Sequence, residues 1–528
     1  MQHKNAADRP SLFWADQVAA EVVEKWQAKE YVTEMGLGAS GIPHVGSAGD
    51  GVRSYVVSLA IRELGKKSRF IAYSDDRDGL RKVPSGFPAS LEREIGKPVS
   101  LIPDPFGCHA SFALHISSLL MDAFDRIGVR FELHRGHEEY ERGGLDKEII
   151  EILTRAKEAG EIIKRTTGSE KYLDRLPFLP ICATCGRVYT TRAHTFLPKE
   201  KKVLYSCDQE FVGKSGGREI RITGCGAQGE AGIRDGKLAW KVEFAARWHA
   251  LNVHYEAYGK DILDSVRCND AVSQELLGRA PPVHSFYELF TERGGEKISK
   301  SKGNVFTPQK WLSYASPESL RLLFLKRLGT TRIVDVEAIP AYMDEVDSLA
   351  DVAFGKTRIG NDKELAHRKR LFAYVHFLSP PAKPGLTVPY GKLVNIVRAT
   401  AGNQLLLRDV LAQAGLAADR TQQEELERRI GYATQWAAID KTPPATMALS
   451  TREKRALSRL AHVLRTEHSP EELQNAVFTI AKDEGMQPRE FFTLLYRILL
   501  GVDRGPKAGH LIAALGQDAA REAIMKRL

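Results

Sequence analysis

Two segments far apart in the chain combine small residues with side chains that can stabilise phosphate charge. In residues 40–47 (SGIPHVGS), glycines let the backbone approach a ligand, and His44 can donate to phosphate oxygens. Residues 297–302 (KISKSK) set Lys297 and Lys300 among small hydroxyl residues, as suits a loop that closes over a triphosphate. Each segment alone is also typical of a simpler feature, a tight turn or an exposed basic loop.

A second kind of chemistry is indicated by cysteine spacing. Four of the six cysteines gather in one block, namely Cys182, Cys185, Cys207 and Cys225. A Cys-x-x-Cys pair followed by two single cysteines can supply four thiolates to a structural zinc ion. The alternatives are an insertion without metal, or His194 replacing one thiolate. Cys108 and Cys268 are interpreted as ordinary buried thiols.

The elements that must position these residues begin as an α/β unit. Residues 11–31 have helical spacing of apolar side chains, the glycine-rich segment 36–51 follows, and residues 68–74 resemble a buried strand that ends in an acidic cluster beginning at Asp75. Strand, glycine-rich turn, helix and strand are the start of a nucleotide-binding parallel sheet. The same pattern resumes over residues 240–304.

The remaining segments are of three kinds. Residues 108–175 have mostly helical patterns, and the glycine- and cysteine-rich block 177–232 contains short runs typical of strands. From Pro317 the sequence is almost entirely helical, interrupted by the proline-rich linker 379–385. Residues 469–472 (SPEE) predict a helix N-terminus with a capping box.

Composition narrows the classes of protein. The chain has 528 residues, enough for several domains, and its 76 Lys and Arg against 67 Asp and Glu give a net charge of +9. This basic excess is compatible with a polyanionic partner. No stretch approaches the roughly 18 apolar residues of a membrane span, and the cysteine pattern is not that of a secreted disulfide scaffold. We therefore expect a cytoplasmic protein without membrane association.

In this order, the two loops resemble the HIGH and KMSKS motifs, the signature pair of class I aminoacyl-tRNA synthetases. Ser47 stands at the position of the second histidine of HIGH, and Ile298 stands at the position of the methionine of KMSKS. Further segments resemble the class I lysyl-tRNA synthetase family in particular. These segments are residues 75–84, 102–107, 237–240, 246–248, 259–261 and 491–506. The resemblance extends over nearly the whole chain.

The resemblance implies an α/β fold, a Rossmann-type class I catalytic domain with a zinc-bearing insertion, followed by an all-α anticodon-binding domain. The catalytic domain would comprise residues 1–125 and 233–310, separated by the insertion 126–232. A helical region that contacts the tRNA stem would occupy residues 311–378, and the anticodon-binding domain residues 379–528.

The resemblance also implies site residues. Catalysis would depend on His44, Lys297 and Lys300. ATP would be bound by Ser40, Gly41, Gly46, Ser47, Asp261, Ser299 and Ser301, with the Asp261 carboxylate accepting hydrogen bonds from the ribose. The amino acid would lie among Gly36, Gly38, Trp240, Tyr287 and Glu288, because an ammonium group needs aromatic walls and a carboxylate in place of water.

The implied activity is that of a lysine–tRNA ligase, with ATP, lysine and tRNA-Lys as partners, Mg²⁺ at the phosphates and structural Zn²⁺. The sequence does not fix the oligomeric state, and a monomer is the working expectation. Gly38 and Ile262 depart from the family pattern, Ile262 standing where a histidine is usual. Two alternatives therefore stay open: a related ligase for another amino acid, and a non-enzymatic tRNA-binding paralogue.

Overall fold

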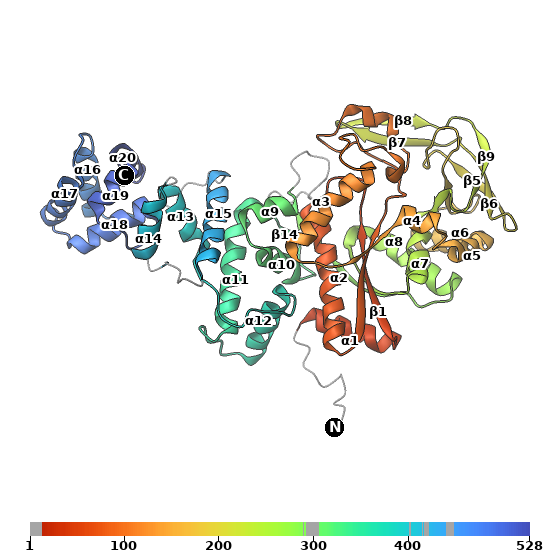
Figure 1. Ribbon diagram of the computed structural model, residues 1–528, viewed down its shortest axis with the longest axis horizontal. Coiled ribbons are helices and arrows are strands. Elements are labelled where there is room, and N and C mark those ends of the chain that lie inside the picture. The colour runs from red at the N-terminus through yellow and green to blue at the C-terminus, as the bar shows by residue number, and fades with distance from the viewer. Residues whose placement is uncertain are drawn as a thin grey trace, which may run out of the picture. The chain divides into compact units, whose positions relative to one another are not determined.

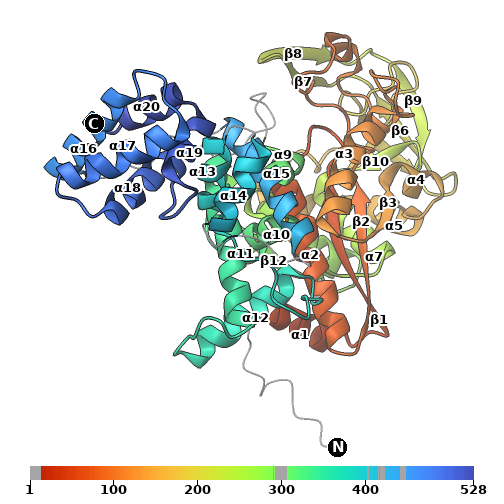
Figure 2. The same ribbon diagram turned by 60° about the vertical axis from the view of Figure 1, so that its left-hand side comes forward.

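The computed structural model is shown from two directions in Figures 1 and 2. It describes residues 13–288, 290–291, 306–400, 403–413, 416, 422–439 and 448–528. The predicted lysine-serine loop, residues 297–302, lies outside these ranges. The chain divides into two compact units. The first takes the residues up to Lys310, Leu320–Asp335 and Ile359–Pro380, and the second takes Trp311–Ser319, Val336–Arg358 and Pro381–Leu528.

The first unit is built on a five-stranded parallel sheet of order β12-β11-β1-β2-β3. Its strands are β1 (Glu30–Leu37), β2 (Lys67–Ser74), β3 (Glu132–Arg135), β11 (Val253–Gly259) and β12 (Val283–Tyr287). Every residue of β11 is buried, as expected for a strand with both faces covered. The chain leaves β1 toward β2 and β3, and only later adds β11 and β12 on the other side. This reversal creates a switch point between β1 and β11.

Helices cover both faces of this sheet. They include α1 (Trp14–Trp26), α2 (Val45–Glu63), α3 (Phe112–Ile127), α7 (Trp240–Ala250) and α8 (Leu263–Ala271). Residues of α7 and α8 share a core cluster with Val32 and Ile71. The α2 helix packs on the opposite face, where Gly51 lies against Met35 and Phe124. The predicted Rossmann-type architecture is thereby confirmed.

A mixed insertion separates the two halves of the sheet. It comprises α4 (Gly136–Glu141), α5 (Asp146–Thr154), α6 (Ala156–Thr167), β4 (Phe178–Pro180), β5 (Arg192–Leu197), β6 (Lys202–Ser206), β7 (Glu210–Ser215), β8 (Arg218–Thr223), β9 (Gln228–Gly232) and β10 (Gly236–Leu238). β7 and β8 form a hairpin separate from the β5-β6-β9 sheet (Figures 1 and 2). The helical pattern predicted for 108–175 missed β3, because a four-residue edge strand of mixed polarity has no visible periodicity.

The later segments are helical, as predicted. In the second unit, the α-helices that lie within its residue ranges are α11 (Ile339–Ala353), α13 (Tyr390–Thr400), α14 (Gln404–Gln413), α15 (Gln423–Ile439), α16 (Thr451–Val463), α17 (Pro470–Asp483), α18 (Pro488–Leu500), α19 (Ala508–Leu515) and α20 (Gln517–Met525). Ser469 and Glu472 form the predicted capping box. The linker 379–385 contains neither helix nor strand. Within the described ranges, no helix has the length and apolar character that crossing a bilayer requires.

One buried ion pair ties two helices of the second unit together. Arg429 on α15 makes two hydrogen bonds of 2.7 Å to Asp347 on α11, and both side chains are 9% exposed. A bidentate pair with this burial resists separation, because without Asp347 the buried guanidinium would keep its pair with the more exposed Glu425, at 2.8 Å, but lose both bonds to the buried carboxylate.

We therefore expect Asp347→Ala to lower the free energy of unfolding by about 3–5 kcal/mol, measured by urea unfolding. Asp503→Ala is the matched control in the same unit, because its partner Arg497 and Asp503 itself are largely exposed, and such pairs contribute little. Equal losses in the two variants would contradict the assigned role.

Candidate functional site

A cavity of about 280 Å³ opens at the carboxyl edge of the parallel sheet. Its lining includes the residues that follow four strands: Gly38 after β1, Asp75 after β2, Asp261 after β11 and Glu288 after β12. Carboxyl ends of parallel strands meet at one edge, and the crevice beside a switch point is where such sheets bind ligands. The position of the cavity therefore follows from the strand order.

The phosphate-binding chemistry expected of the glycine loop lies at the start of α2. His44 is the N-cap residue, and its Nδ1 accepts a hydrogen bond from the Ser47 backbone N–H at 3.3 Å. A neutral imidazole that accepts at Nδ1 carries its proton on Nε2. The helix N-terminus adds partial positive charge and backbone donors. This end of the cavity is suited to an anion.

Gly46 is required by the position of the histidine ring. A Cβ at residue 46 would lie 2.8 Å from His44 Cε1 and 2.9 Å from Nδ1. A side chain at this position would displace the imidazole from its hydrogen bond with Ser47. The His-x-Gly spacing therefore has a steric reason.

The opposite side of the cavity is dominated by carboxylates around one guanidinium. Arg247 on α7 forms ion pairs with Glu34 at 2.6 Å, Asp75 at 3.2 Å and Glu256 at 2.8 Å. Glu256 also accepts a hydrogen bond from the Trp248 indole at 2.6 Å. Three carboxyl groups share this one cation, and two of them, Asp75 and Glu256, line the cavity.

Burial opposes the ionisation of two of these carboxyl groups, Glu34 and Asp75. Burial raises the pKa of Asp75 to about 7, although the Arg247 charge opposes the shift. It also raises the pKa of Glu34 far above its ordinary range, again against Arg247. An added cation would favour the ionised forms, since an opposite charge nearby lowers a carboxyl pKa. The carboxylate side of the cavity is thus suited to a positively charged group.

Aromatic side chains complete the walls. Trp240, Phe244 and Tyr287 line the cavity. The Trp240 and Phe244 ring centroids are 5.1 Å apart, and the Arg53 guanidinium lies 3.9 Å from the Tyr287 ring centre. Glu288 is already paired with Lys260 at 2.7 Å, so it offers less negative charge to a ligand than Asp75.

Most of the predicted site residues that the structure describes come together here. Those lining the cavity are Gly36, Gly38, His44, Gly46, Ser47, Trp240, Asp261, Tyr287 and Glu288. Ser40 and Gly41 lie in the same loop, just before His44, and are not among the residues that line the cavity. Lys297, Ser299, Lys300 and Ser301 lie outside the described residues.

Sequence reasoning missed the charged residues Asp75, Arg247 and Glu256. Asp75 could have been found, because it is the first residue after a buried strand and begins an acidic cluster. Arg247 and Glu256 gave no such signal, since they stand within a helix and a strand of mixed composition. Ile262, noted as a departure from the family pattern, also lines the cavity.

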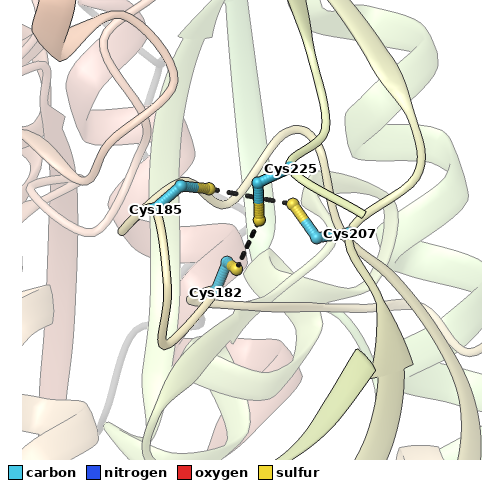
Figure 3. A group of neighbouring side chains, drawn as sticks. All are labelled: Cys182, Cys185, Cys207 and Cys225. Atoms are coloured by element: carbon cyan, nitrogen blue, oxygen red, sulfur yellow. Dashed lines mark hydrogen bonds between the residues drawn. The ribbon is translucent and has the colours of Figure 1, made fainter. Parts of the chain in front are cut away.

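The four predicted metal-ligating cysteines converge in the insertion, as Figure 3 shows. The Cys182 and Cys225 sulfurs are 3.6 Å apart, and those of Cys185 and Cys207 are 3.7 Å apart. All four sulfurs lie within 4.8 Å of one another, and none is in a disulfide. A tetrahedral zinc ion with Zn–S bonds of ~2.3 Å holds its sulfurs ~3.8 Å apart. The cluster therefore fits zinc.

The backbone around these cysteines also has the form of a metal knuckle. Gly186 and Gly226 each follow a cysteine directly and have φ of +73° and +79°. The Gly226 N–H donates to the Cys207 carbonyl at 2.9 Å. His194, the alternative ligand, is exposed and contacts the Thr195 hydroxyl. It does not belong to the cluster.

A second group of metal-ligating side chains was not predicted. Asp104, Cys108, His109 and His115 place one ligand atom each within 4.8 Å of the others. The Cys108 sulfur is 3.1 Å from His109 Nδ1 and 3.2 Å from His115 Nδ1, and His115 Nδ1 is 3.3 Å from Asp104. The interpretation of Cys108 as a buried thiol was wrong, because this cysteine is exposed, whereas Cys268 is buried as expected.

Comparison with known proteins identifies the family. The family model described as "tRNA synthetases class I (K)" matches residues 12–377, a range that includes the cavity and both groups of metal-ligating side chains. The chain belongs to this family.

Three relatives illustrate the similarity within the family. The chain is 42% identical to a lysine–tRNA ligase of Cenarchaeum symbiosum, with 98% of both chains covered. It is 30% identical to a lysine–tRNA ligase of Haloarcula marismortui, covering 96% of this chain and 95% of that one. For the lysine–tRNA ligase of Roseobacter denitrificans the identity is 29%, covering 98% and 96%.

The carboxylate cluster generates a prediction about stability. Arg247→Met would leave Glu34, Asp75 and Glu256 without their shared cation, and the pKa values of Glu34 and Asp75, which burial already raises, would rise further above those of the unfolded state. The added cost is absent at low pH, where both states are protonated, and grows as pH rises. We expect a loss of more than about 3 kcal/mol at pH 8 and a clearly smaller loss at pH 5.5, measured by urea unfolding.

Arg126→Met is the control, because Arg126 pairs with Asp122 on the exposed side of α3. Its effect should be small and nearly independent of pH. A loss in Arg247→Met that does not change between the two pH values would show that the guanidinium does not compensate buried carboxylates.

Proposed function

We propose that this chain is a lysine–tRNA ligase that activates lysine with ATP and transfers it to tRNA-Lys. The observation that carries the proposal is the polarity of one cavity: His44 and the α2 N-terminus on one side, and the excess of carboxylates around Arg247 on the other. The first suits the phosphates of ATP and the second suits an ammonium group. The names of the relatives agree with this assignment.

ATP would lie with its phosphates against the α2 N-terminus. The His44 Nε2–H would donate to a phosphate oxygen as charge moves onto the leaving pyrophosphate. Asp261, two residues after the end of β11, would accept hydrogen bonds from the ribose hydroxyls. Mg²⁺ would be bound chiefly by the phosphate oxygens, as this ion usually retains water and substrate ligands. Lys297, Lys300, Ser299 and Ser301 are assigned to closure over the phosphates, as family resemblance implies.

Lysine would place its side-chain ammonium toward Asp75 and Glu256, between the Trp240 and Tyr287 rings. Its carboxylate would attack the α-phosphorus of ATP, forming lysyl-adenylate and releasing pyrophosphate. The 3′-terminal ribose hydroxyl of tRNA would then take the lysyl group and release AMP. Positioning and charge stabilisation would supply most of the acceleration.

The same charges disfavour an anionic amino acid. A glutamate side chain would need a cation that is not already paired with other carboxylates. Arg247 is the arginine that lines the described part of the cavity, and it pairs with three carboxyl groups. Ile262, at the same wall, is apolar and provides no compensating donor. Lysine is therefore favoured over the related alternative of a glutamyl-type ligase.

The helical second unit would bind the tRNA, with the anticodon read by the helices after residue 379. The basic helix α16 offers no residue that we assign to this contact, because Arg455 and Arg459 are paired with Glu484 at 2.9 and 3.2 Å. The reaction would take place in the cytoplasm, where ATP and tRNA are available, and the protein would act as a monomer.

Two structural metal ions are part of the proposal. The four cysteines would hold zinc within the insertion. Asp104, Cys108, His109 and His115 would hold a second ion of the same kind, since Zn–N bonds of ~2.0 Å and Zn–S bonds of ~2.3 Å place their atoms at about the separations observed. The Asp104 carboxylate also accepts backbone N–H bonds from Phe106, Cys108 and His109, which holds that loop in place.

The function is tested by pyrophosphate exchange into ATP with each of the twenty amino acids. Lysine should stimulate exchange most. At subsaturating lysine, kcat/KM for lysine should rise about tenfold between pH 6 and 8, as Asp75 with a pKa of about 7 becomes ionised. Asp75→Asn should lower kcat/KM for lysine by about 10- to 100-fold (about 1.4–2.8 kcal/mol) and flatten this pH dependence.

Lys202→Met is the matched control, because it removes an exposed charge that pairs with Glu230 in the insertion. It should leave the kinetics unchanged. Exchange stimulated by another amino acid in preference to lysine would overturn the specificity, and no stimulation by any amino acid would overturn the ligase assignment.

Metal analysis of the purified protein should find about two zinc ions per chain. Cys207→Ser and Cys108→Ser should each lower the content to about one, because each removes a ligand from a different group. Cys268→Ala is the control, since Cys268 belongs to neither group, and it should retain both ions. A Cys108→Ser protein with the full metal content would refute the second ion alone.

A further inference from the structure

A buried lysine behind the cavity is not used by the chemistry described so far. Lys237 on β10 is 1% exposed, and its ammonium pairs with Asp78 and, at 2.6 Å, with Glu243. None of these three residues lines the cavity. Asp78 in turn accepts the indole N–H of Trp240 on both carboxylate oxygens, at 3.1 and 3.0 Å. Trp240 does line the cavity.

We propose that Lys237 is a positioning residue for the amino-acid pocket, acting through Asp78 to fix the Trp240 indole as one wall. The inference rests on the proposed function, whose lysine site includes that wall. It adds residues that set the shape of the site without touching the substrate. They determine selectivity for the amino acid and leave ATP binding to other elements.

The charge arrangement makes the role of Lys237 specific. A buried ammonium is tolerated only when carboxylates replace its water, and here two do so. If Lys237 were absent, Asp78 and Glu243 would be two buried carboxylates without their shared cation. Asp78 and Glu243 would then move toward water or other donors, and Asp78 would no longer be held in place to accept the indole N–H. The position of the Trp240 ring therefore depends on the ammonium group behind it.

The hydrogen bonds that involve Lys237, Asp78 and Glu243 also connect to residues of the insertion. The Tyr140 hydroxyl donates to Glu243 at 2.7 Å and accepts from the Leu238 backbone N–H at 2.8 Å. Tyr140 belongs to α4, while Leu238 and Lys237 belong to β10, which pairs with β4 just before Cys182. The indole is thus anchored to the base of the insertion as well as to the loop after β2.

An anchored indole matters because of where Trp240 stands. It is the first residue of α7, and its ring contacts Phe244 one turn later. With its N–H bound to Asp78, the Trp240 ring stays in place as the wall of the pocket and leaves space for a substrate side chain. A released ring would be able to occupy that space, which would weaken lysine binding without touching the phosphate side.

The test is a double-mutant cycle between Lys237→Met and Trp240→Phe, with the KM for lysine and the KM for ATP measured separately. We expect Lys237→Met to raise the KM for lysine at least tenfold, with KM for ATP and kcat within threefold of wild type. In the Trp240→Phe background the same change should raise it less than threefold, because the indole N–H is already absent. Lys237→Arg, which keeps the charge, should recover part of the loss.

Multiplicative effects in the cycle, or equal effects on lysine and ATP, would overturn the proposal. If Lys237→Met does not fold, Asp78→Asn takes its place in the cycle, because it keeps the side-chain volume while removing the charge that pairs with Lys237. The Lys202→Met variant should behave as wild type throughout.

A second measurement needs no substrate. The fluorescence of Trp240, obtained as the difference between each protein and its Trp240→Phe counterpart, should become more accessible to acrylamide in Lys237→Met and in Asp78→Asn. Unchanged accessibility would refute the anchoring even if the kinetics changed. Failure of the proposed function would instead appear in wild-type protein, as exchange that lysine does not stimulate.

Discussion

The Arg247 guanidinium is the interaction on which the site depends. Its partners come from three separate places: Glu34 on β1, Glu256 on β11 and Asp75 after β2. Glu34 and Glu256 are register partners across the β1–β11 pair, where like charges destabilise a sheet. The guanidinium on α7 offsets that repulsion, so it joins the two halves of the sheet that the insertion separates in sequence.

The same interaction gives the cavity its polarity. One guanidinium serves three carboxyl groups, and two of these, Asp75 and Glu256, line the cavity, so this side can accept a cationic group. At the other side, the α2 N-terminus and His44 supply donors and partial positive charge. A ligand with an anionic and a cationic part is favoured over one with a single sign, as the reaction of ATP with lysine requires.

The insertion contributes to this site through more than its metal. β10 leads from the insertion directly into α7, which carries Trp240 and Arg247. The segment from Lys237 to Arg247 therefore connects β4 at the base of the insertion, which β10 pairs with, to the aromatic wall and the guanidinium. Packing of the insertion and selection of the amino acid are in this view properties of one continuous segment.

Sequence by itself determined the features whose chemistry is local. The glycine loop with His44, the strand ending at Asp75, the capping box at Ser469 and the four cysteines all depend on residues whose types carry their own signal. Tertiary structure decided what requires distant partners. Arg247 lines the cavity because parallel strands bring Glu34 and Glu256 together beside it, and Lys237 pairs with Asp78 because both are buried behind the cavity. Spacing along a chain reveals periodicity and turns, whereas the free energy of a buried charge depends on neighbours that the fold supplies.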